Sequence, residues 1–236
     1  MKYLALLPVC AALALGVSSC IIVVGDEGEL HTHAAWSDDA RGEVLRGSGV
    51  AQTQAREVPE FHAIRLRGGA DVRVRIGAER GVQVTCDDNL VDKLTTVVED
   101  GVLEIGMLEG RYRFKNQPCV VVAAQTLDAF LLEGAGDVAI EGASGAALRL
   151  EVSGAGDLCA RGAVDQLTVA VSGAGDLELQ DLAARVASVS VSGAGDVHVN
   201  ASETLEASIS GAGDVRYRGS PKLSKQVSGA GSIRQE

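Results

Sequence analysis

The sequence predicts an all-β protein with a single folded domain, a parallel β-helix or β-solenoid with coils of about 19 residues. Three observations predict it: a four-residue motif that recurs along the second half of the chain, alternating apolar residues around each copy, and 29 glycines with only 4 prolines. Glycine without proline, with aliphatic residues between, is typical of regular strands joined by tight corners. Aromatic residues make up 3% of the chain, so the core must consist of aliphatic side chains.

The recurring motif is Gly-Ala-Gly-Asp, and its successive copies are 20, 19, 20, 18 and 18 residues apart. A sixth copy, Gly229–Ser232, ends in serine, and a degenerate copy, Gly68–Asp71, lies upstream. A fixed period of this length indicates a repeat architecture in which each copy forms one coil. The five complete copies end at Asp137, Asp157, Asp176, Asp196 and Asp214.

The residues around each motif alternate between apolar and polar, as in Leu148, Leu150 and Val152 before one copy and Leu158 after it. A period of two indicates strands on both sides of the motif. We expect the glycines to permit a positive φ at a sharp corner, and the alanine between them to point inward. Because strict hexads are absent and the spacing drifts, the right-handed coil is preferred over the left-handed hexapeptide helix.

The first residues resemble an export signal, with Lys2 before an uncharged apolar run that ends at Val17-Ser18-Ser19-Cys20. This segment resembles the lipobox of bacterial lipoproteins, which implies a signal peptide over residues 1–19 and lipidation of Cys20. The alternative is an ordinary secretory signal with an incidental cysteine. Acylation would hold the protein on a membrane, and Ile21 after the cysteine favours the outer membrane. The predicted location is therefore the outer membrane, the periplasm or the cell surface.

Residues 20–46 carry scattered acidic residues without a clear period, which predicts a flexible tether. The solenoid domain is expected over residues 47–236, with an irregular half at 47–127 and the regular repeats at 128–236. In the irregular half, residues 89–94 predict a short turn or helix, and Thr95–Val98, Glu99–Gly101 and Val102–Ile105 predict a hairpin.

This layout resembles the putative auto-transporter adhesin head GIN domain family over roughly residues 47–236. The features that carry the resemblance are the opening Gly47-Ser48-Gly49, the strand Phe61–Leu66, the segment Asn89–Leu94, the turn and strand Asp100–Ile105, and the terminal Gly-x-Gly-Asp ladder. The resemblance implies a β-helical domain on an exported bacterial protein and brings no catalytic residues.

The repeated aspartates, Asp137, Asp157, Asp176, Asp196 and Asp214, are expected to align along one edge of the stack. Their carboxylates should cap backbone N–H groups at the corners, extend into water or share cations; capping is favoured because aspartate commonly bonds backbone in turns. The serines before the motifs lack a neighbouring base, so they are expected to be turn hydroxyls and not nucleophiles. His31 and His33 could bind a metal weakly, but no metal site is predicted.

The cysteines of the mature chain are Cys86, Cys119 and Cys159, without the CxxC spacing of a zinc or redox site. Buried free thiols are favoured, although a disulfide between Cys86 and Cys119 remains open.

The leading functional hypothesis is a lipid-anchored cell-envelope solenoid that presents a binding or adhesion surface without catalysis, to an envelope glycan or protein. The alternative is a structural or stress-related envelope protein without a specific ligand. A polysaccharide-active enzyme is a remote alternative, because nearly identical coils provide no special coil for a catalytic site. The net charge of −11 and the lack of clustered Lys and Arg argue against nucleic-acid binding. No cofactor is expected, and the sequence predicts neither the ligand nor the oligomeric state.

Overall fold

The computed structural model describes residues 43–236, which form one compact unit. The predicted signal peptide, Cys20, His31, His33 and most of the predicted tether lie outside the described residues. The elements are β1 Val44–Arg46, β2 Ala51–Arg56, β3 Ala63–Leu66, β4 Asp71–Ile76, β5 Gly81–Asp87, the 3₁₀ helix η2 Val91–Lys93, β6 Leu94–Glu99, β7 Val102–Met107, β8 Arg111–Arg113, β9 Cys119–Ala124, β10 Ala129–Leu132, β11 Val138–Val152, β12 Leu158–Val171, β13 Leu177–Val191, β14 Val197–Ile209, β15 Val215–Arg218, β16 Lys222–Val227 and β17 Ile233–Gln235.

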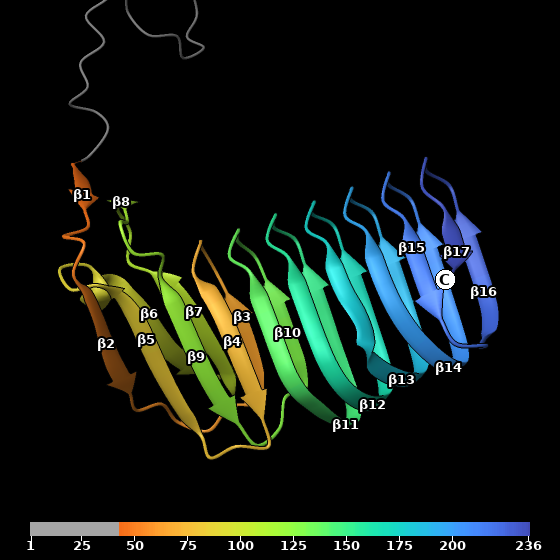
Figure 1. Ribbon diagram of the computed structural model, residues 1–236, viewed down its shortest axis with the longest axis horizontal. Coiled ribbons are helices and arrows are strands. Elements are labelled where there is room, and N and C mark those ends of the chain that lie inside the picture. The colour runs from red at the N-terminus through yellow and green to blue at the C-terminus, as the bar shows by residue number, and fades with distance from the viewer. Residues whose placement is uncertain (1–42) are drawn as a thin grey trace, which may run out of the picture. The chain divides into compact units, whose positions relative to one another are not determined.

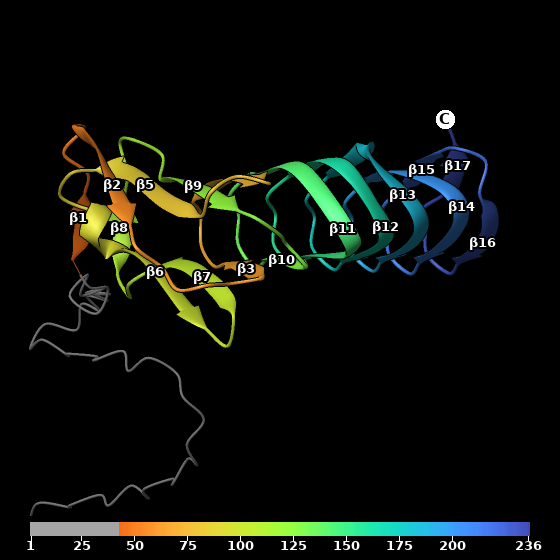
Figure 2. The same cartoon turned by 90° about the horizontal axis from the view of Figure 1, so that it is seen from below.

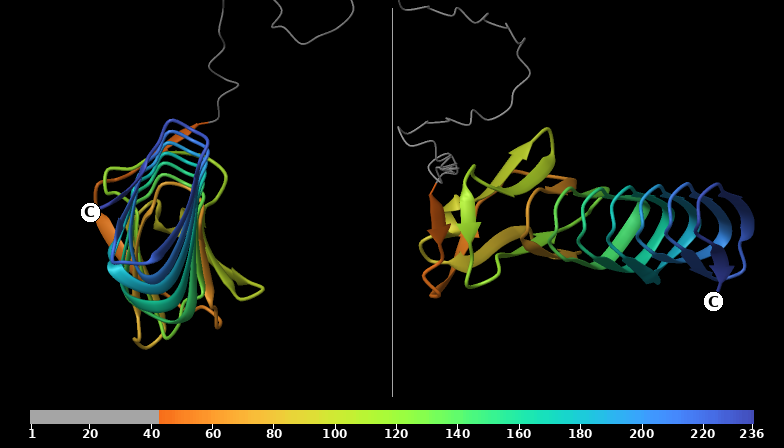
Figure 3. Two further views of the ribbon diagram at one scale, coloured as in Figure 1. Left: turned by 90° about the vertical axis from the view of Figure 1, so that its right-hand side faces the viewer. Right: turned by 90° about the horizontal axis from the view of Figure 1, so that it is seen from above.

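The repeats form a parallel β-solenoid, as the sequence predicts. Each of β11, β12, β13 and β14 is one long strand that curves round a full coil and pairs in parallel with the next. The Gly-Ala-Gly-Asp motifs form the sharp corners between successive strands, and these corners stand in a file (Figure 1). Viewed end-on, the coils superimpose into one flattened outline with a sharp corner at one end and a rounded bend at the other (Figure 3).

The rounded bend absorbs the drift in repeat length. Strands β11 and β12 pair with an offset of 20 residues at Val138↔Leu158 and 19 residues at Ala143↔Gly162, with the register shift between them. The shifts between β12 and β13 and between β13 and β14 lie in the same part of the coil, where Figure 2 shows the strands curving. The corners and flat faces therefore stay in register although the copies differ by up to two residues.

The core is a set of aliphatic rows that run along the axis, one residue from each coil. Alternate residues on both sides of each motif point inward, as the period of two predicts. The row through β10–β14 is typical of these rows and consists of Phe130, Leu150, Val169, Val189 and Ala207, all at most 1% exposed. Each side chain covers its equivalent in the next coil, so stacking completes a core that one coil could not enclose.

The N-terminal half is less regular. The predicted hairpin is present as β6 and β7, joined by a turn in which Asp100 and Gly101 both have positive φ, and residues 91–93 form the predicted short helix. Strand β9 pairs in parallel with β4 and antiparallel with β5, and β2 continues the sheet beyond β5. Strand β1, in the last residues of the predicted tether, pairs with β8.

Candidate functional site

The corners are hydrogen-bonded to one another from coil to coil. In each motif the alanine N–H donates to the carbonyl of the first glycine in the preceding copy, at 2.8–3.0 Å. For example, Ala155 N–H reaches Gly134 O at 2.9 Å, and Ala174 N–H reaches Gly154 O at 3.0 Å. The backbone ladder of the faces therefore continues through the turn, and every corner from residue 134 to 231 is part of one continuous array.

The expected reason for the motif glycines is wrong. None of the motif glycines between residues 134 and 231 has a positive φ. A Cβ on Gly154 would instead lie 1.6 Å from Gly134 O, and a Cβ on Gly156 would lie 2.1 Å from Gly136 O. The same collision with the preceding coil recurs at both glycines of the later copies. The motif needs glycine at these two positions because adjacent corners approach too closely there for a side chain.

The expectation that the motif alanines point inward is also wrong. Ala135, Ala155, Ala174, Ala194 and Ala212 are less buried than the glycine that follows each of them. The alanine is the apex of the turn, so its methyl group projects away from the core. The result is a file of small apolar groups along the corner edge, between the serine and aspartate rows.

The repeated aspartates form a file, and each caps the backbone of the next coil. Asp157 Oδ1 accepts from Asp176 N–H at 2.9 Å, Asp176 Oδ1 accepts from Asp196 N–H at 2.9 Å, and Asp196 Oδ1 accepts from Asp214 N–H at 2.8 Å. Asp137 and Asp71 make longer versions of this bond, at 3.3 and 3.2 Å. This confirms corner capping, with the difference that the capped N–H belongs to the following coil. The carboxylate takes the place of a backbone carbonyl where the chain turns.

The file ends at Ser232. Asp214 Oδ1 accepts from both the hydroxyl of Ser232, at 2.8 Å, and its backbone N–H, at 2.7 Å. These two bonds lower the pKa of the Asp214 carboxyl, the hydroxyl contributing most. Arg216 lies 3.6 Å from Asp196 and 3.8 Å from Asp214. Within residues 43–236 no three His, Cys, Asp or Glu side chains are grouped as a metal site would require.

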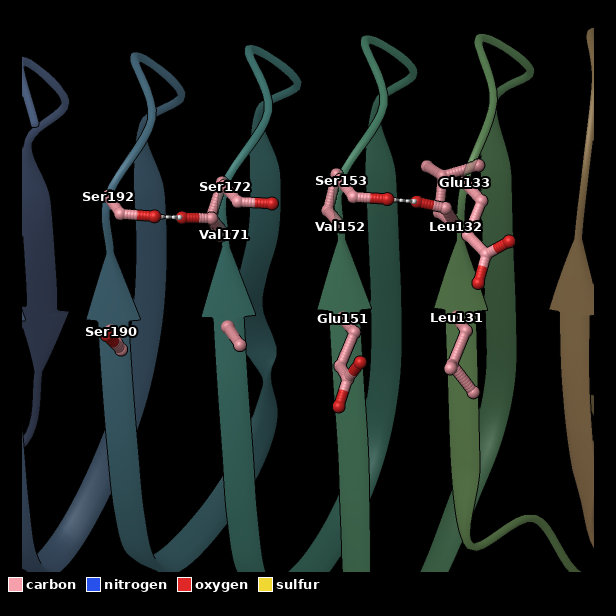
Figure 4. Close-up of a pocket in the computed structure, with 11 residues that line it drawn as sticks. Leu131, Leu132, Glu133, Glu151, Val152, Ser153, Val171, Ser172, Ser190 and Ser192 are labelled. Carbon is pink, nitrogen blue, oxygen red and sulfur yellow. Dashed lines mark hydrogen bonds between the residues drawn. The ribbon is translucent and has the colours of Figure 1, made fainter.

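The serines before the motifs are turn hydroxyls, as predicted. Ser153, Ser192 and Ser228 donate through their Oγ–H to a carbonyl of the preceding coil at 3.3–3.4 Å. Figure 4 shows two of these bonds, from Ser153 to Leu132 and from Ser192 to Val171. A hydroxyl that donates its proton to a carbonyl lacks the neighbouring base that a nucleophilic serine requires.

His198, an isolated histidine on β14, lies in a charged cluster. Its Nε2 is 2.9 Å from an Arg216 nitrogen and its Nδ1 is 2.9 Å from Glu236. Arginine can only donate, so Nε2 accepts and Nδ1 carries the proton toward Glu236. Glu236 also pairs with Arg218 at 2.8 Å, so it links the histidine to a second arginine.

The three cysteines are free thiols. Cys86 is buried on the core side of β5, and burial raises the pKa of its thiol. Cys119 pairs with Thr85, the neighbour of Cys86, so it faces the other side of the sheet and cannot reach Cys86. Cys119 and Cys159 are half-buried on outward-facing positions, which corrects the expectation that all three are buried.

We call one flat surface of the solenoid the ascending face. It consists of the strands that lead into the corners, namely β3, β10, the second halves of β11–β14 and β16, and of β7, which pairs with β3 at its N-terminal end. At its N-terminal end this face is charged, with Arg65 2.8 Å from Glu104 and Arg67 3.0 Å from Glu133. Asp165 and Arg185 form an ion pair beside the rounded bend. Between that pair and the corner, over residues 166–172 and 186–192, the face carries no charge, and its outward residues near the corner are small: Thr168, Ala170, Ser172, Ser188, Ser190 and Ser192.

A shallow depression of about 140 Å³ lies on the ascending face, against the corners of β10–β13 (Figure 4). Leu131 and Glu151 line one side of the depression, and the uncharged Ala170, Ser190 and Ser192 line the other. These residues align because each is paired in register with its equivalent in the next coil. The sequence shows the alternation within each repeat. It does not show that small outward residues on two consecutive coils lie side by side.

The opposite surface, the descending face, differs in charge. It consists of β4, the first halves of β11–β14, β15 and β17, which leave the corners. Arg73, Glu178 and Arg216 project from it beside the aspartate file. This face is therefore polar and charged over most of its length, whereas the ascending face has a neutral region two coils wide.

A buried carboxylate in the irregular half was not singled out by the sequence reasoning. Asp87 is fully buried and accepts from Gly49 N–H at 2.9 Å, Lys115 N–H at 2.9 Å and Asn116 Nδ2 at 2.7 Å. Burial alone would raise the pKa of Asp87, but the hydrogen bonds from Lys115 and Asn116 bring it below the ordinary value. Gly47 packs against the carboxylate, since a Cβ there would lie 1.9 Å from Asp87 Oδ2.

Asp87 explains two of the segments that carry the family resemblance. Ser48 N–H donates to Asn89 Oδ1 at 2.9 Å, and Asn89 Nδ2 donates to Arg46 O at 2.8 Å. The opening Gly-Ser-Gly and the segment that begins at Asn89 are thus one structural unit, which we call the N-terminal lock. The sequence contains both motifs, but it does not show that they contact each other.

Comparisons with known proteins agree with the fold. The sequence profile of the family described as "Putative auto-transporter adhesin, head GIN domain" matches residues 60–221. A putative adhesin from Bacteroides fragilis is 24% identical, with a TM-score of 0.70, and the match covers 81% of this chain and 100% of that one. No curated protein matches the chain significantly.

Two structures from Parabacteroides distasonis are also similar in fold. One is described as a putative lipid binding protein, with 24% identity, a TM-score of 0.52 and coverage of 82% of this chain and 100% of that one. The other is a putative adhesin, with 18% identity, a TM-score of 0.53 and the same coverage. Within residues 43–236, no helix is long and apolar enough to cross a membrane.

Proposed function

This chain belongs to the family described as putative auto-transporter adhesins with a head GIN domain, and we propose that it is an exported, non-catalytic binding module of the cell envelope. Its proposed anchor is a lipid on Cys20, after removal of residues 1–19. Its proposed binding surface is the neutral part of the ascending face, and its ligand an envelope glycan or protein.

The observation that carries the proposal is the set of small, uncharged outward residues on β12 and β13 near the corner, Thr168, Ala170, Ser188 and Ser190, which we call the neutral grid. Thr168, Ser188 and Ser190 offer hydroxyls that can both donate and accept, and they sit on a rigid sheet in register. Short side chains lose little conformational entropy when a ligand covers them. Such a surface suits an extended ligand with many hydroxyl or amide groups, which can bond to several coils at once.

The absence of catalysis is part of the proposal. It is supported by the use of the repeated polar groups within the fold: the Asp176 carboxylate binds a backbone N–H, and the Ser192 hydroxyl donates to a carbonyl. Turnover of an acidic polysaccharide by the purified chain would contradict this part of the proposal and would favour a carbohydrate-active enzyme.

Binding can be tested with two matched substitutions. Ala170 on the ascending face and Ala139 on the descending face are both half-buried, outward-facing alanines in regular coils. We expect Ala170→Arg to weaken binding of the soluble chain to native envelope fractions about tenfold, equivalent to roughly 1.4 kcal/mol, and Ala139→Arg to leave it unchanged. The soluble chain starts at residue 20 and carries Cys20→Ser, and cosedimentation measures binding.

Unchanged binding by Ala170→Arg, or an equal loss with Ala139→Arg, would contradict the proposed surface. Envelope binding by neither the wild-type chain nor the variants would favour a structural envelope protein without a specific ligand. That second candidate is supported by the aspartate file, in which the repeated carboxylates serve the fold itself.

The proposed anchor has a separate test. In cells, Cys20→Ser should abolish incorporation of labelled fatty acid and move the protein from the membrane fraction to the soluble fraction. If labelling and membrane association persist in the variant, Cys20 is not the lipidation site. This result would leave the proposed binding surface untouched.

A further inference from the structure

The last coil differs from the others at its core-facing positions. Strand β16 pairs in register with β14, with Leu205↔Leu223, Ala207↔Lys225 and Ile209↔Val227. Paired residues of parallel strands point to the same side of the sheet. Lys225 therefore stands at a position that faces the core, where the preceding coils carry the buried row Phe130, Leu150, Val169, Val189 and Ala207.

The other strand of the last coil shows the same change. Val199 of β14 pairs with Tyr217 of β15, and Tyr217 pairs with Gln235 of β17. Val199 is buried, so Gln235 also occupies a core-facing position. Its Nε2 donates to Gly219 O at 2.7 Å. Each strand of the last coil thus carries a polar residue where the regular coils carry an aliphatic one.

These polar residues lie within an apolar rim that faces outward. Leu223 and Ile233 are only partly buried, and Val227 is 44% exposed. Within residues 43–236, no strand pairs with the outer edges of β16 and β17. Ala207 beneath Lys225 is nevertheless 1% exposed, so the aliphatic stem of the lysine and its neighbours cover the core while the ammonium remains in water.

An open strand edge with an apolar rim is a template on which another chain can pair. A second copy that approached this end would bring its own Lys225 to the same apolar centre. Pairing would then bury two like charges without partners, which is strongly unfavourable. Ser232 acts in the same direction, because it replaces the aspartate whose carboxylate would accept the next backbone N–H.

We propose that Lys225 prevents two copies of this chain from joining tail to tail at the open edges of β16 and β17. This inference is independent of the proposed binding function. It also predicts the product that forms when the block is removed. Substitution of Lys225 removes the charge only from the C-terminal edge, so two such edges pair with each other and the product is a closed dimer.

Sedimentation velocity of the soluble chain from residue 20 with Cys20→Ser, over a range of concentrations, tests the proposal. The wild-type chain should remain monomeric, and Lys225→Val, which restores the valine of earlier coils, should form dimers with at least about tenfold tighter self-association. Lys222→Val is the matched control, because it removes the same charge from the same strand at an exposed position paired with Thr204. Lys222→Val should remain monomeric.

Three outcomes would overturn the proposal: wild-type dimers at the concentrations where Lys225→Val dimerises, a Lys225→Val variant that stays monomeric, or equal dimerisation by Lys222→Val. Circular dichroism must show the same strand content in all variants. If Lys225→Val does not fold, Lys225→Ala, which copies Ala207 of the preceding coil, replaces it in the same comparison.

Discussion

The regular coils and the N-terminal lock satisfy the backbone at chain reversals in two different ways. At each corner the carbonyls and carboxylates of one copy bind the N–H groups of the next copy, as between Asp176 and Asp196. In the N-terminal lock a single buried carboxylate, Asp87, binds N–H groups from two segments far away in the sequence. Each corner therefore depends on the adjacent copies of the same motif, whereas Asp87 depends on partners that occur once in the chain.

This difference determines how much of the fold a destabilising substitution perturbs. A side chain added at one corner collides with the adjacent coil, and the coils depend on stacking for their core. A change at Asp87 leaves that stacking intact but frees the N-terminal segment from the solenoid. We therefore expect substitutions in the two regions to differ in size and in pH dependence.

The largest effect is expected from Gly154→Ala. Its Cβ would lie 1.6 Å from Gly134 O, and the backbone on both sides is hydrogen-bonded and cannot move freely. We expect a loss of about 3 kcal/mol or more in the free energy of unfolding, or failure to fold. Urea denaturation measures it. Gly69→Ala is the control, since a methyl group at Gly69 would have no other atom within 4 Å; equal losses in both variants would contradict steric exclusion.

The next largest effect is expected from Asp87→Asn. The substitution places an amide NH₂ where only acceptors fit, opposite the N–H groups of Gly49 and Lys115. We expect a clear loss of stability, smaller than that of Gly154→Ala. Faster hydrogen exchange should be confined to residues 43–50 and 111–116, and exchange spread over the repeats would contradict a local lock.

The Asp87 carboxyl also predicts a pH dependence. Its folded-state pKa lies below its ordinary value, about 3.9 in an unfolded chain. A depressed pKa contributes stability that is present above the unfolded-state pKa and is lost as the pH falls through the folded-state pKa. The stability difference between the wild-type chain and Asp87→Asn should therefore shrink below about pH 4. A difference that stays constant from pH 7 to pH 3 would argue against this role.

A smaller effect is expected within the aspartate file. Asp176→Ala removes the acceptor of Asp196 N–H and should cost about 0.5–1.5 kcal/mol in urea denaturation. Asp176→Asn keeps an oxygen acceptor and should stay within about 0.5 kcal/mol of the wild-type chain. If the asparagine variant loses as much as the alanine variant, charge and not capping is what the aspartate provides.

The smallest effect is expected from reducing agents. With Cys86 and Cys119 on opposite sides of the sheet, dithiothreitol should leave the unfolding curve unchanged. A maleimide should modify Cys119 and Cys159 in the folded chain and Cys86 only after unfolding. Mass spectrometry counts the modified thiols, and protection of Cys119 together with Cys86 would indicate a disulfide after all.

Sequence reasoning succeeded where the chain is periodic. The alternation around Leu148 and Leu158 predicted the strands, and the spacing of the motifs predicted the coils and the file of aspartates. It was wrong about two features of the corner. Ala155 points outward and not inward, and Gly154 is required because a side chain would collide with the adjacent coil, not because the backbone has a positive φ. Both depend on the distance between coils, which one repeat read alone does not contain.

The site features that were missed depend on pairing across coils or segments. Lys225 reads as an ordinary surface lysine until its register with Ala207 is known. Asp87 reads as one acidic residue among many until the chain brings Gly47 and Lys115 to it. The neutral grid on β12 and β13 likewise appears only when the outward residues of two coils are set side by side.

The stacking of the corners can be measured directly with pulsed electron paramagnetic resonance between spin labels on the corner alanines. Pairs at Ala135 and Ala194, Ala135 and Ala212, and Ala135 and Ala230 lie three, four and five coils apart, in a chain whose native cysteines are replaced. The mean distance should increase by about 4.8 Å with each added coil, the spacing of neighbouring strands. Distances that do not grow with the number of intervening coils would contradict the solenoid.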